Sequence, residues 1–162
     1  MLKNIAKRAV KALQVENGWK LVSPKTIRMA DGQPYMKRLI LFRTPFGGLM
    51  INHFIGGDES RCHHDHPWPF ISIMVKGGYR EFVPTGHGEA ESEHHAPCIL
   101  FRPAKHTHRV EMLEPGGQCL TICITGPSER DWGFITKKGW LYWREYLAQT
   151  EGNPDGERDL CG

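Results

Sequence analysis

Two histidines separated by one residue stand in the segment 62–70, CHHDHPWPF. Because alternate residues of a β-strand face the same side, His64 and His66 point together if this segment is extended. Two imidazoles on one face, one residue apart, are able to bind a single metal ion. The ion needs a third ligand from elsewhere in the fold, and the segment 103–110, PAKHTHRV, supplies further histidines. The spacing therefore predicts a histidine metal site.

The two histidine segments resemble, in composition and order, the paired motifs of the cupin superfamily. The His-x-His pair is followed by an apolar strand that ends in Gly77, then by a variable loop, and then by Pro-x-x-x-x-His from Pro103 to His108. The resemblance covers residues 56–124. It implies an antiparallel β-barrel in which His64, His66 and His108 bind one divalent metal ion.

The sequence departs from the cupin motifs at two positions. Phe70 stands where the family usually carries a glutamate ligand, and Lys105 stands where the second motif has glycine. The ligand set that remains is neutral, and it resembles that of the thiol dioxygenase branch, of which cysteine dioxygenase is the best-known member. The resemblance implies Fe(II) as the cofactor, although neutral nitrogen ligands also suit Zn, Ni, Mn or Cu.

A second register of the same segment is an alternative. His63, Asp65 and His108 would form a triad of two histidines and one carboxylate, of the kind found in non-haem Fe(II) oxygenases. The two registers exclude each other, because His63 and Asp65 face away when His64 and His66 face inward. The match of Gly77 and Pro103 to the cupin spacing favours the register with three histidines.

The same alternation predicts which side chains surround the metal. Trp68 and Phe70 are expected to wall the substrate pocket. Arg102 is expected to reach inward, where its planar fork would hold a carboxylate or phosphate, and Arg80 is a second substrate-binding candidate.

Three side chains are candidates for moving a proton during catalysis. His106 shares the parity of His108, so it is either a catalytic base or a partner of the metal ligands. Tyr79 and Glu81 are the other two candidates, on the strand that follows Gly77.

These residues predict a metal-dependent enzyme that acts on a small molecule. The first hypothesis is a non-haem Fe(II) dioxygenase, in which the ion activates bound groups directly. A metal-dependent isomerase, epimerase or lyase is an alternative, in which the ion stabilises an enolate. A non-catalytic cupin that only binds a small molecule is a third, since a fold alone does not determine function.

The elements that must position this site are short β-rich runs separated by turn residues, a pattern typical of an all-β barrel. The predicted strands are 38–43, 49–55, 70–76, 80–83, 98–101, 109–113 and 119–125. The segment 84–97, PTGHGEAESEHHAP, is predicted to be a long polar loop. Residues 19–150 are therefore expected to form one cupin-type antiparallel barrel, also called a double-stranded β-helix or jelly roll.

The two ends of the chain are expected to lie outside this barrel. Residues 1–18 repeat apolar side chains at helical spacing, which predicts an amphipathic helix packed on the barrel. The aromatic segment 140–147 is predicted to be a short C-terminal helix. Residues 151–162 are polar and glycine-rich, so we expect a flexible tail.

Composition limits the class of protein. A chain of 162 residues with 40% hydrophobic residues fits one globular domain, and its net charge of +3 gives no indication of nucleic-acid binding. It has no apolar run of membrane-spanning length, so we expect a cytoplasmic protein. Its five cysteines lack a CxxC pair or regular spacing, which favours free thiols; Cys62, beside the site, is either reactive or a small buried side chain. The cupin resemblance further implies a homodimer.

Overall fold

The structure is a computed structural model that describes residues 20–57, 62–151 and 153–161. The elements in this part of the chain are β1 (Lys20–Arg28), β2 (Pro34–Thr44), β3 (Gly47–Phe54), β4 (Phe70–Thr85), β5 (Gly88–His95), β6 (Cys98–Arg102), β7 (Arg109–Met112), β8 (Cys119–Thr125), β9 (Gly133–Thr136), β10 (Gly139–Tyr142), α2 (Trp143–Thr150) and α3 (Pro154–Cys161).

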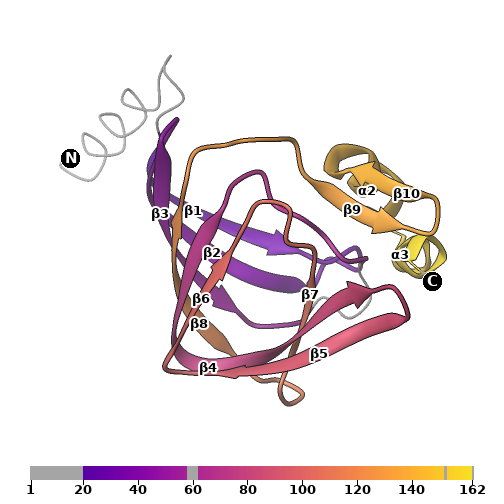
Figure 1. Cartoon of the computed structure of the whole chain (residues 1–162), viewed down its shortest axis with the longest axis horizontal. Helices are drawn as coiled ribbons and strands as arrows, with labels where there is room; N and C mark the ends of the chain where they lie inside the picture. The colour runs from indigo at the N-terminus through magenta and orange to yellow at the C-terminus, as the bar shows by residue number, and fades with distance from the viewer. Residues whose placement is uncertain (1–19, 58–61, 152, 162) are drawn as a thin grey trace.

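Eight antiparallel strands form two layers that share the long strand β4 (Figure 1). The first half of β4 pairs with β8 and β6, which places it in the layer β1-β2-β3-β8-β4-β6. Its second half pairs with β5 and β7 in the other layer. The described pairings do not close into a ring, so the barrel has an open side. This confirms the all-β prediction, but with an incompletely closed sheet.

β4 changes layers at Gly77 and Gly78, where the sequence predicted a turn between two separate strands. Gly77 has a φ of +73°, and a Cβ atom there would lie 1.8 Å from the carbonyl oxygen of Gln118. Only glycine fits this bend without displacing the neighbouring strand. The bend makes Tyr79 and Glu81 face the same interior as Ser72 and Met74, because all four side chains are buried.

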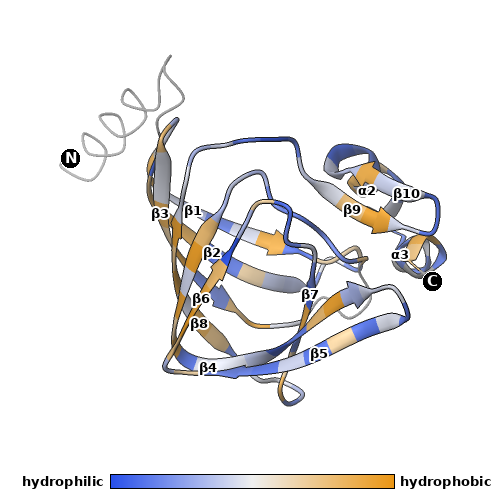
Figure 2. Ribbon diagram, in the orientation of Figure 1, coloured by the Kyte–Doolittle hydropathy of each residue, from blue (hydrophilic) through white to orange (hydrophobic). Residues whose placement is uncertain are grey.

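The interior of the barrel is apolar at one end. This core cluster consists of Tyr35, Met36, Met74, Tyr79, Val110, Met112 and Cys119. The opposite side of the first layer carries exposed Ile71, Ile99, Phe101 and Ile124, and Figure 2 shows the corresponding hydrophobic colouring along β6 and β8. Both faces of this layer are therefore rich in apolar residues, while the polar site described below lies inside the barrel.

Residues 84–97 form a hairpin arm instead of the predicted loop. β5 pairs with the second half of β4 from Gly78↔His95 to Thr85↔Gly88. All residues of β5 except His94 are exposed, so this edge strand has no apolar alternation by which to recognise it.

The C-terminal region also differs from the prediction. Residues 139–142 form β10 and pair with β9, and the helix begins only at Trp143. The expected tail contains α3, whose Cys161 forms a disulfide with Cys62, with the two Cα atoms 4.8 Å apart. The prediction of free thiols is therefore wrong for this pair, because residues 99 positions apart in sequence meet in the fold. Cys98, Cys119 and Cys123 are free.

The predicted N-terminal helix, 1–18, lies outside the described residues. Within the described part of the chain, no helix is long and apolar enough to cross a membrane.

The bend at Gly77 generates the first prediction. The Gly77→Ala substitution should lower the free energy of unfolding by about 2 kcal/mol or more, because the new Cβ atom collides with backbone and the φ is unfavourable. Gly86→Ala is the matched control, since no heavy atom lies within 4 Å of its Cβ position. Equal stability of the two variants in urea denaturation would contradict this account of the bend.

Candidate metal centre

The segment that carries the His-x-His pair is extended and hydrogen-bonded on both sides. On one side, the backbone N–H of His64 donates to the carbonyl of His108 (2.8 Å), and the N–H of His108 donates back to His64 (3.0 Å). On the other side, the N–H of Ile135 in β9 donates to the carbonyl of His63 (2.7 Å). Residues 63–66 therefore alternate as a strand does, and the backbone pairing brings His64 directly opposite His108.

This alternation decides between the two registers. Asp65 is 3% exposed and faces away from His64 and His66. It accepts hydrogen bonds from the Gly133 backbone (2.8 Å) and Trp140 Nε1 (3.0 Å) and forms an ion pair with Arg130. The Nε2 atom of His63 lies 2.8 Å from a carboxylate oxygen of Glu89. The alternative triad of His63, Asp65 and His108 is thus not assembled.

His64, His66 and His108 converge in the interior. Their ligand atoms all lie within 4.8 Å of one another, and the Nε2 atoms of His66 and His108 are 3.0 Å apart. Two nitrogens that bind one ion at about 2.1 Å, at right angles to each other, are separated by about 3.0 Å. The spacing of this pair therefore fits cis ligands of one metal ion.

The protonation of the ligands also fits a metal. Burial lowers the pKa of His66 well below its ordinary value, and the neighbouring His108, His64 and His106 lower it further. Burial likewise lowers the pKa of His108, although the adjacent Glu81 carboxylate acts in the opposite direction. Neutral imidazoles have the free lone pair that a metal ion requires.

Glu81 holds His108 in place. Its carboxylate is 2% exposed, and one oxygen lies 2.5 Å from His108 Nδ1, the ring nitrogen opposite the one that faces His66. His94 and His106 also contact this carboxylate, each at 2.9 Å, and Arg102 forms a two-pronged ion pair with it. Burial opposes ionisation, but the contacts with His106, His108 and Arg102 outweigh it and hold the pKa of Glu81 far below its ordinary value. A carboxylate on the outer nitrogen of a ligand histidine fixes the ring and raises its basicity.

Glu81, His106 and His108 form a second group with ligand atoms close enough for a metal ion. We assign this group to hydrogen bonding. The Glu81 carboxylate is already occupied by its ion pair with Arg102 and by its contacts with His94, His106 and His108.

One of the predicted pocket residues, Phe70, lies beside the histidines. The ring of Phe70 packs against that of His66, with centroids 4.7 Å apart. Trp68 is covered by the guanidinium of Arg43, 3.7 Å from the ring centroid. Arg102 points inward, as its parity predicts, but it contacts Glu81 and Phe101.

Tyr79 and Arg80 lie away from the three histidines. Tyr79 belongs to the apolar core cluster, and burial, followed by the nearby Glu81 charge, raises the pKa of its hydroxyl. Arg80 is on the other face of β4, where it contacts Glu93 (3.2 Å) and the carbonyl of Leu113 (3.2 Å).

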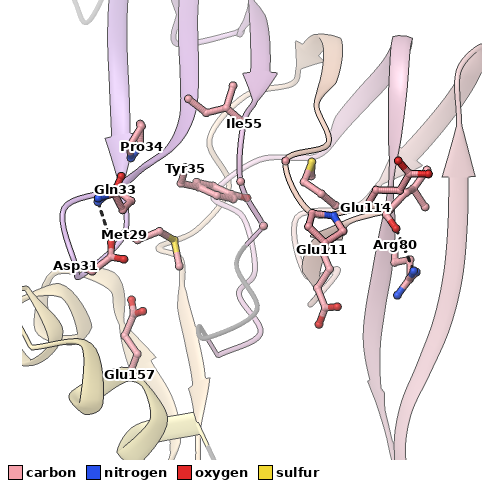
Figure 3. A pocket seen from close by; sticks show the side chains of 16 residues that line it. Met29, Asp31, Gln33, Pro34, Tyr35, Ile55, Arg80, Glu111, Glu114 and Glu157 are labelled. Atoms are coloured by element: carbon pink, nitrogen blue, oxygen red, sulfur yellow. Dashed lines mark hydrogen bonds between the residues drawn. The ribbon is translucent and has the colours of Figure 1, made fainter.

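Arg80 instead lines a separate pocket of about 840 Å³ between the β1–β2 turn, the end of β7 and α3 (Figure 3). Tyr35 projects into this pocket, and four carboxylate residues, Asp31, Glu111, Glu114 and Glu157, line it. None of the three histidines is among its lining residues.

Sequence reasoning missed the central position of Glu81 and the anchoring role of Asp65. The sequence indicates Glu81 only as a candidate proton carrier, although a glutamate on the inward face of a strand is typical of a paired interior charge. Asp65 between two ligand histidines offered a comparable signal, because the register that turns the histidines inward places this carboxylate on the opposite face.

No family model matches the sequence, and no curated protein matches it either. Solved structures do resemble its fold. The polyketide cyclase RemF from Streptomyces resistomycificus has a TM-score of 0.56 at 15% identity, over 82% of this chain and 92% of that one. Fe(II) HppE has a TM-score of 0.53 at 13% identity, over 64% of this chain and 56% of that one, so the match spans little more than half of its length. Hydroxypropylphosphonic acid epoxidase from S. wedmorenis gives 0.51 at 11% identity, over 64% and 55%.

The contact between Glu81 and His108 generates a prediction for the metal site. Glu81→Gln should weaken metal binding by about 10–100-fold, because the amide is a poorer partner for His108 Nδ1. Zn²⁺ affinity measured by competition with a chelator, together with the melting temperature, checks this. Glu93→Gln, on exposed β5, is the control. Unchanged Zn²⁺ affinity in a folded Glu81→Gln variant would show that Glu81 is not needed for the ligand geometry.

Asp65 generates a prediction for stability. Asp65→Asn should lower the free energy of unfolding by about 2 kcal/mol, because it removes the charge that pairs with Arg130 and leaves fewer acceptors for buried donors. The control is Asp131→Asn, which changes an exposed residue two positions before β9 and should have almost no effect on stability. If both variants unfold at the same urea concentration as the parent, Asp65 does not anchor β9 and β10.

Proposed function

We propose that this chain, which has the cupin fold, is a mononuclear metal-dependent enzyme that acts on a small molecule. His64, His66 and His108 would hold one divalent ion. Fe(II) is the ion we propose first, and Zn, Ni, Mn and Cu are alternatives for the same neutral nitrogen ligands.

One observation carries the proposal. Three imidazoles from two distant segments converge inside the barrel, with two Nε2 atoms 3.0 Å apart and a buried carboxylate behind one of them. A cluster of histidines needed only for packing would not require Glu81 at the outer nitrogen of His108. That pairing of carboxylate, histidine and metal site is typical of metalloenzymes.

When bound, the ion would polarise or activate small molecules at the positions that the three histidines leave open. The chain itself would orient the ligands and shape the space beside them. Glu81 fixes the ring of His108, and the Phe70 ring against His66 supplies an apolar wall that limits access of water.

The state of the candidate proton carriers favours oxygenase chemistry. His106 and Glu81 contact each other, and Glu81 is also held by Arg102, while the Tyr79 hydroxyl belongs to the core and has a raised pKa. None of these three described groups is well suited to take a proton from a substrate. Direct activation of groups bound to the metal makes less demand on such a base. The fold likeness to Fe(II) HppE supports the same choice.

A redox-neutral reaction, such as an isomerisation, lyase reaction or cyclisation, is the second candidate. The fold likeness to RemF, described as a polyketide cyclase, favours it. The two candidates differ in their need for oxygen and for a redox-active ion.

Metal content tests the proposal. Elemental analysis of protein purified without a histidine tag, before and after anaerobic reconstitution with Fe(II), should give about one ion per chain. His64→Ala, His66→Ala and His108→Ala should each lose it, because two imidazoles hold the ion poorly. His95→Ala, on exposed β5, should retain it. Equal metal content in all four variants, or none in the parent after reconstitution, would exclude the three-histidine centre.

Oxygen consumption then separates the two reactions. The Fe(II) protein is screened in an oxygen electrode against small thiols and small organic acids, with the His108→Ala variant as background. Turnover that requires both oxygen and Fe(II) supports the oxygenase. Turnover that persists without oxygen, and with Zn²⁺ in place of Fe(II), would establish the redox-neutral reaction instead.

A further inference from the structure

Two arginines of β2, Arg38 and Arg43, face the interior of the barrel near the histidines. Residues directly opposite each other in antiparallel strands share a face. Arg38 lies opposite Asn52, and Arg43 lies opposite Gly48. Both Asn52 and Gly48 are buried on the inner face of β3, so the two arginines lie on that face as well.

Arg38 is held from one side. Its Nε donates to the side-chain oxygen of Asn52 (2.7 Å), and its Nη2 lies 3.8 Å from the sulfur of Met36. Asn52 is 5% exposed, so the hydrogen bond fixes the guanidinium inside the barrel.

Arg43 is held by an aromatic ring. Its guanidinium lies 3.7 Å from the ring centroid of Trp68, two residues after the candidate ligand His66. The Nη1 atom is buried and donates to no described group. Burial lowers the pKa of Arg43, and repulsion from Arg38 lowers it further, so the two positive charges are close enough to interact.

Neither of these two half-buried cations has a described carboxylate beside it. Arg80, Arg102, Arg109 and Arg130 each form an ion pair with a carboxylate. Within residues 20–57, 62–151 and 153–161, neither Arg38 nor Arg43 has such a partner. An uncompensated charge inside a protein is costly, which favours a ligand of opposite charge.

Two threonines of β8, the strand that pairs with β3, also lie in this region. Thr125 lies opposite Gly48, in the same row as Arg43 and Phe70, and Thr121 lies opposite Asn52. Both threonine hydroxyls are buried and make no hydrogen bond within the described chain. Gly48 places no side chain between Arg43 and Thr125.

We propose that Arg38 and Arg43, with the Thr125 hydroxyl, bind the oxyanion group of a small organic acid, a carboxylate or a phosphate, beside the metal centre. The arginine forks match the geometry of these groups, and the hydroxyl supplies one further donor. An anion here satisfies the buried Nη1 of Arg43 and compensates both charges. The claim that this acid is the substrate rests on the proposed function, whereas anion binding does not.

Calorimetric titration with sodium phosphate and with sodium acetate, at constant ionic strength, tests the site. The protein is used both stripped of metal by a chelator and reconstituted with Zn²⁺. The parent should bind one or both anions at a single site, and the anion preferred identifies the oxyanion class. Arg38→Met and Arg43→Met, which keep most of the side-chain volume, should each weaken binding by about tenfold or more. Arg144→Met, which also removes a guanidinium above a tryptophan ring, should bind like the parent.

Additional measurements separate a binding role from a structural one. Melting temperature and metal content are recorded for every variant. Arg38→Lys keeps the positive charge but lacks the planar guanidinium. It should bind the anion more weakly than the parent and more tightly than Arg38→Met. Anion binding should change the tryptophan fluorescence of the parent, and the change should be absent in Trp68→Phe.

A parent that binds neither anion, or folded arginine variants that bind as the parent does, would overturn the inference. If the parent binds an anion but no metal ion, the proposed function fails and the anion site stands.

Discussion

The contact between the buried Glu81 carboxylate and His108 is the interaction on which the site depends. An ionised carboxylate at 2% exposure is stable only if several partners replace its water, and here three histidines and Arg102 do so. The same contact orients the other nitrogen of His108 toward His66. Glu81 reaches this position because β4 bends at Gly77 and enters the second layer. A backbone feature of one residue thus determines the geometry of a site several residues away.

Much of this arrangement follows from period-two alternation, which is why the sequence predicted it. Once residues 63–66 are extended, His64 and His66 must share a face, and Asp65 must take the other. The β-rich runs predicted between 38 and 55, and again between 98 and 125, correspond to β2, β3, β6, β7 and β8. The order of the two histidine motifs indicates a cupin fold, which the two-layer all-β architecture bears out, although the described strands leave one side of the barrel open.

The features that the sequence did not predict depend on contacts between distant segments, and not on the alternation of side chains along one strand. β5 is an exposed edge strand, so both of its faces are polar and nothing marks it as a strand. Cys62 and Cys161 meet because α3 packs near the start of the histidine segment, a contact that spacing along the chain cannot indicate. Side-chain alternation correctly predicted that Arg102 faces the interior, but it could not indicate that the guanidinium pairs with Glu81. Arg38 lies in the predicted strand 38–43, but the sequence does not indicate that its guanidinium faces the interior.

The balance of charge inside the barrel links these observations. Glu81 and Arg102 neutralise each other, and burial lowers the pKa of His66 and of His108, so these groups add little net charge around an ion. A divalent ion would therefore keep most of its positive charge, and Arg38 and Arg43 add two more without a described counter-ion. Since electrostatic interactions are strong in a low-dielectric interior, a small anion beside the bound ion and the two arginines is favoured. The electrostatics of the interior thus favour an acidic ligand whatever reaction the metal performs.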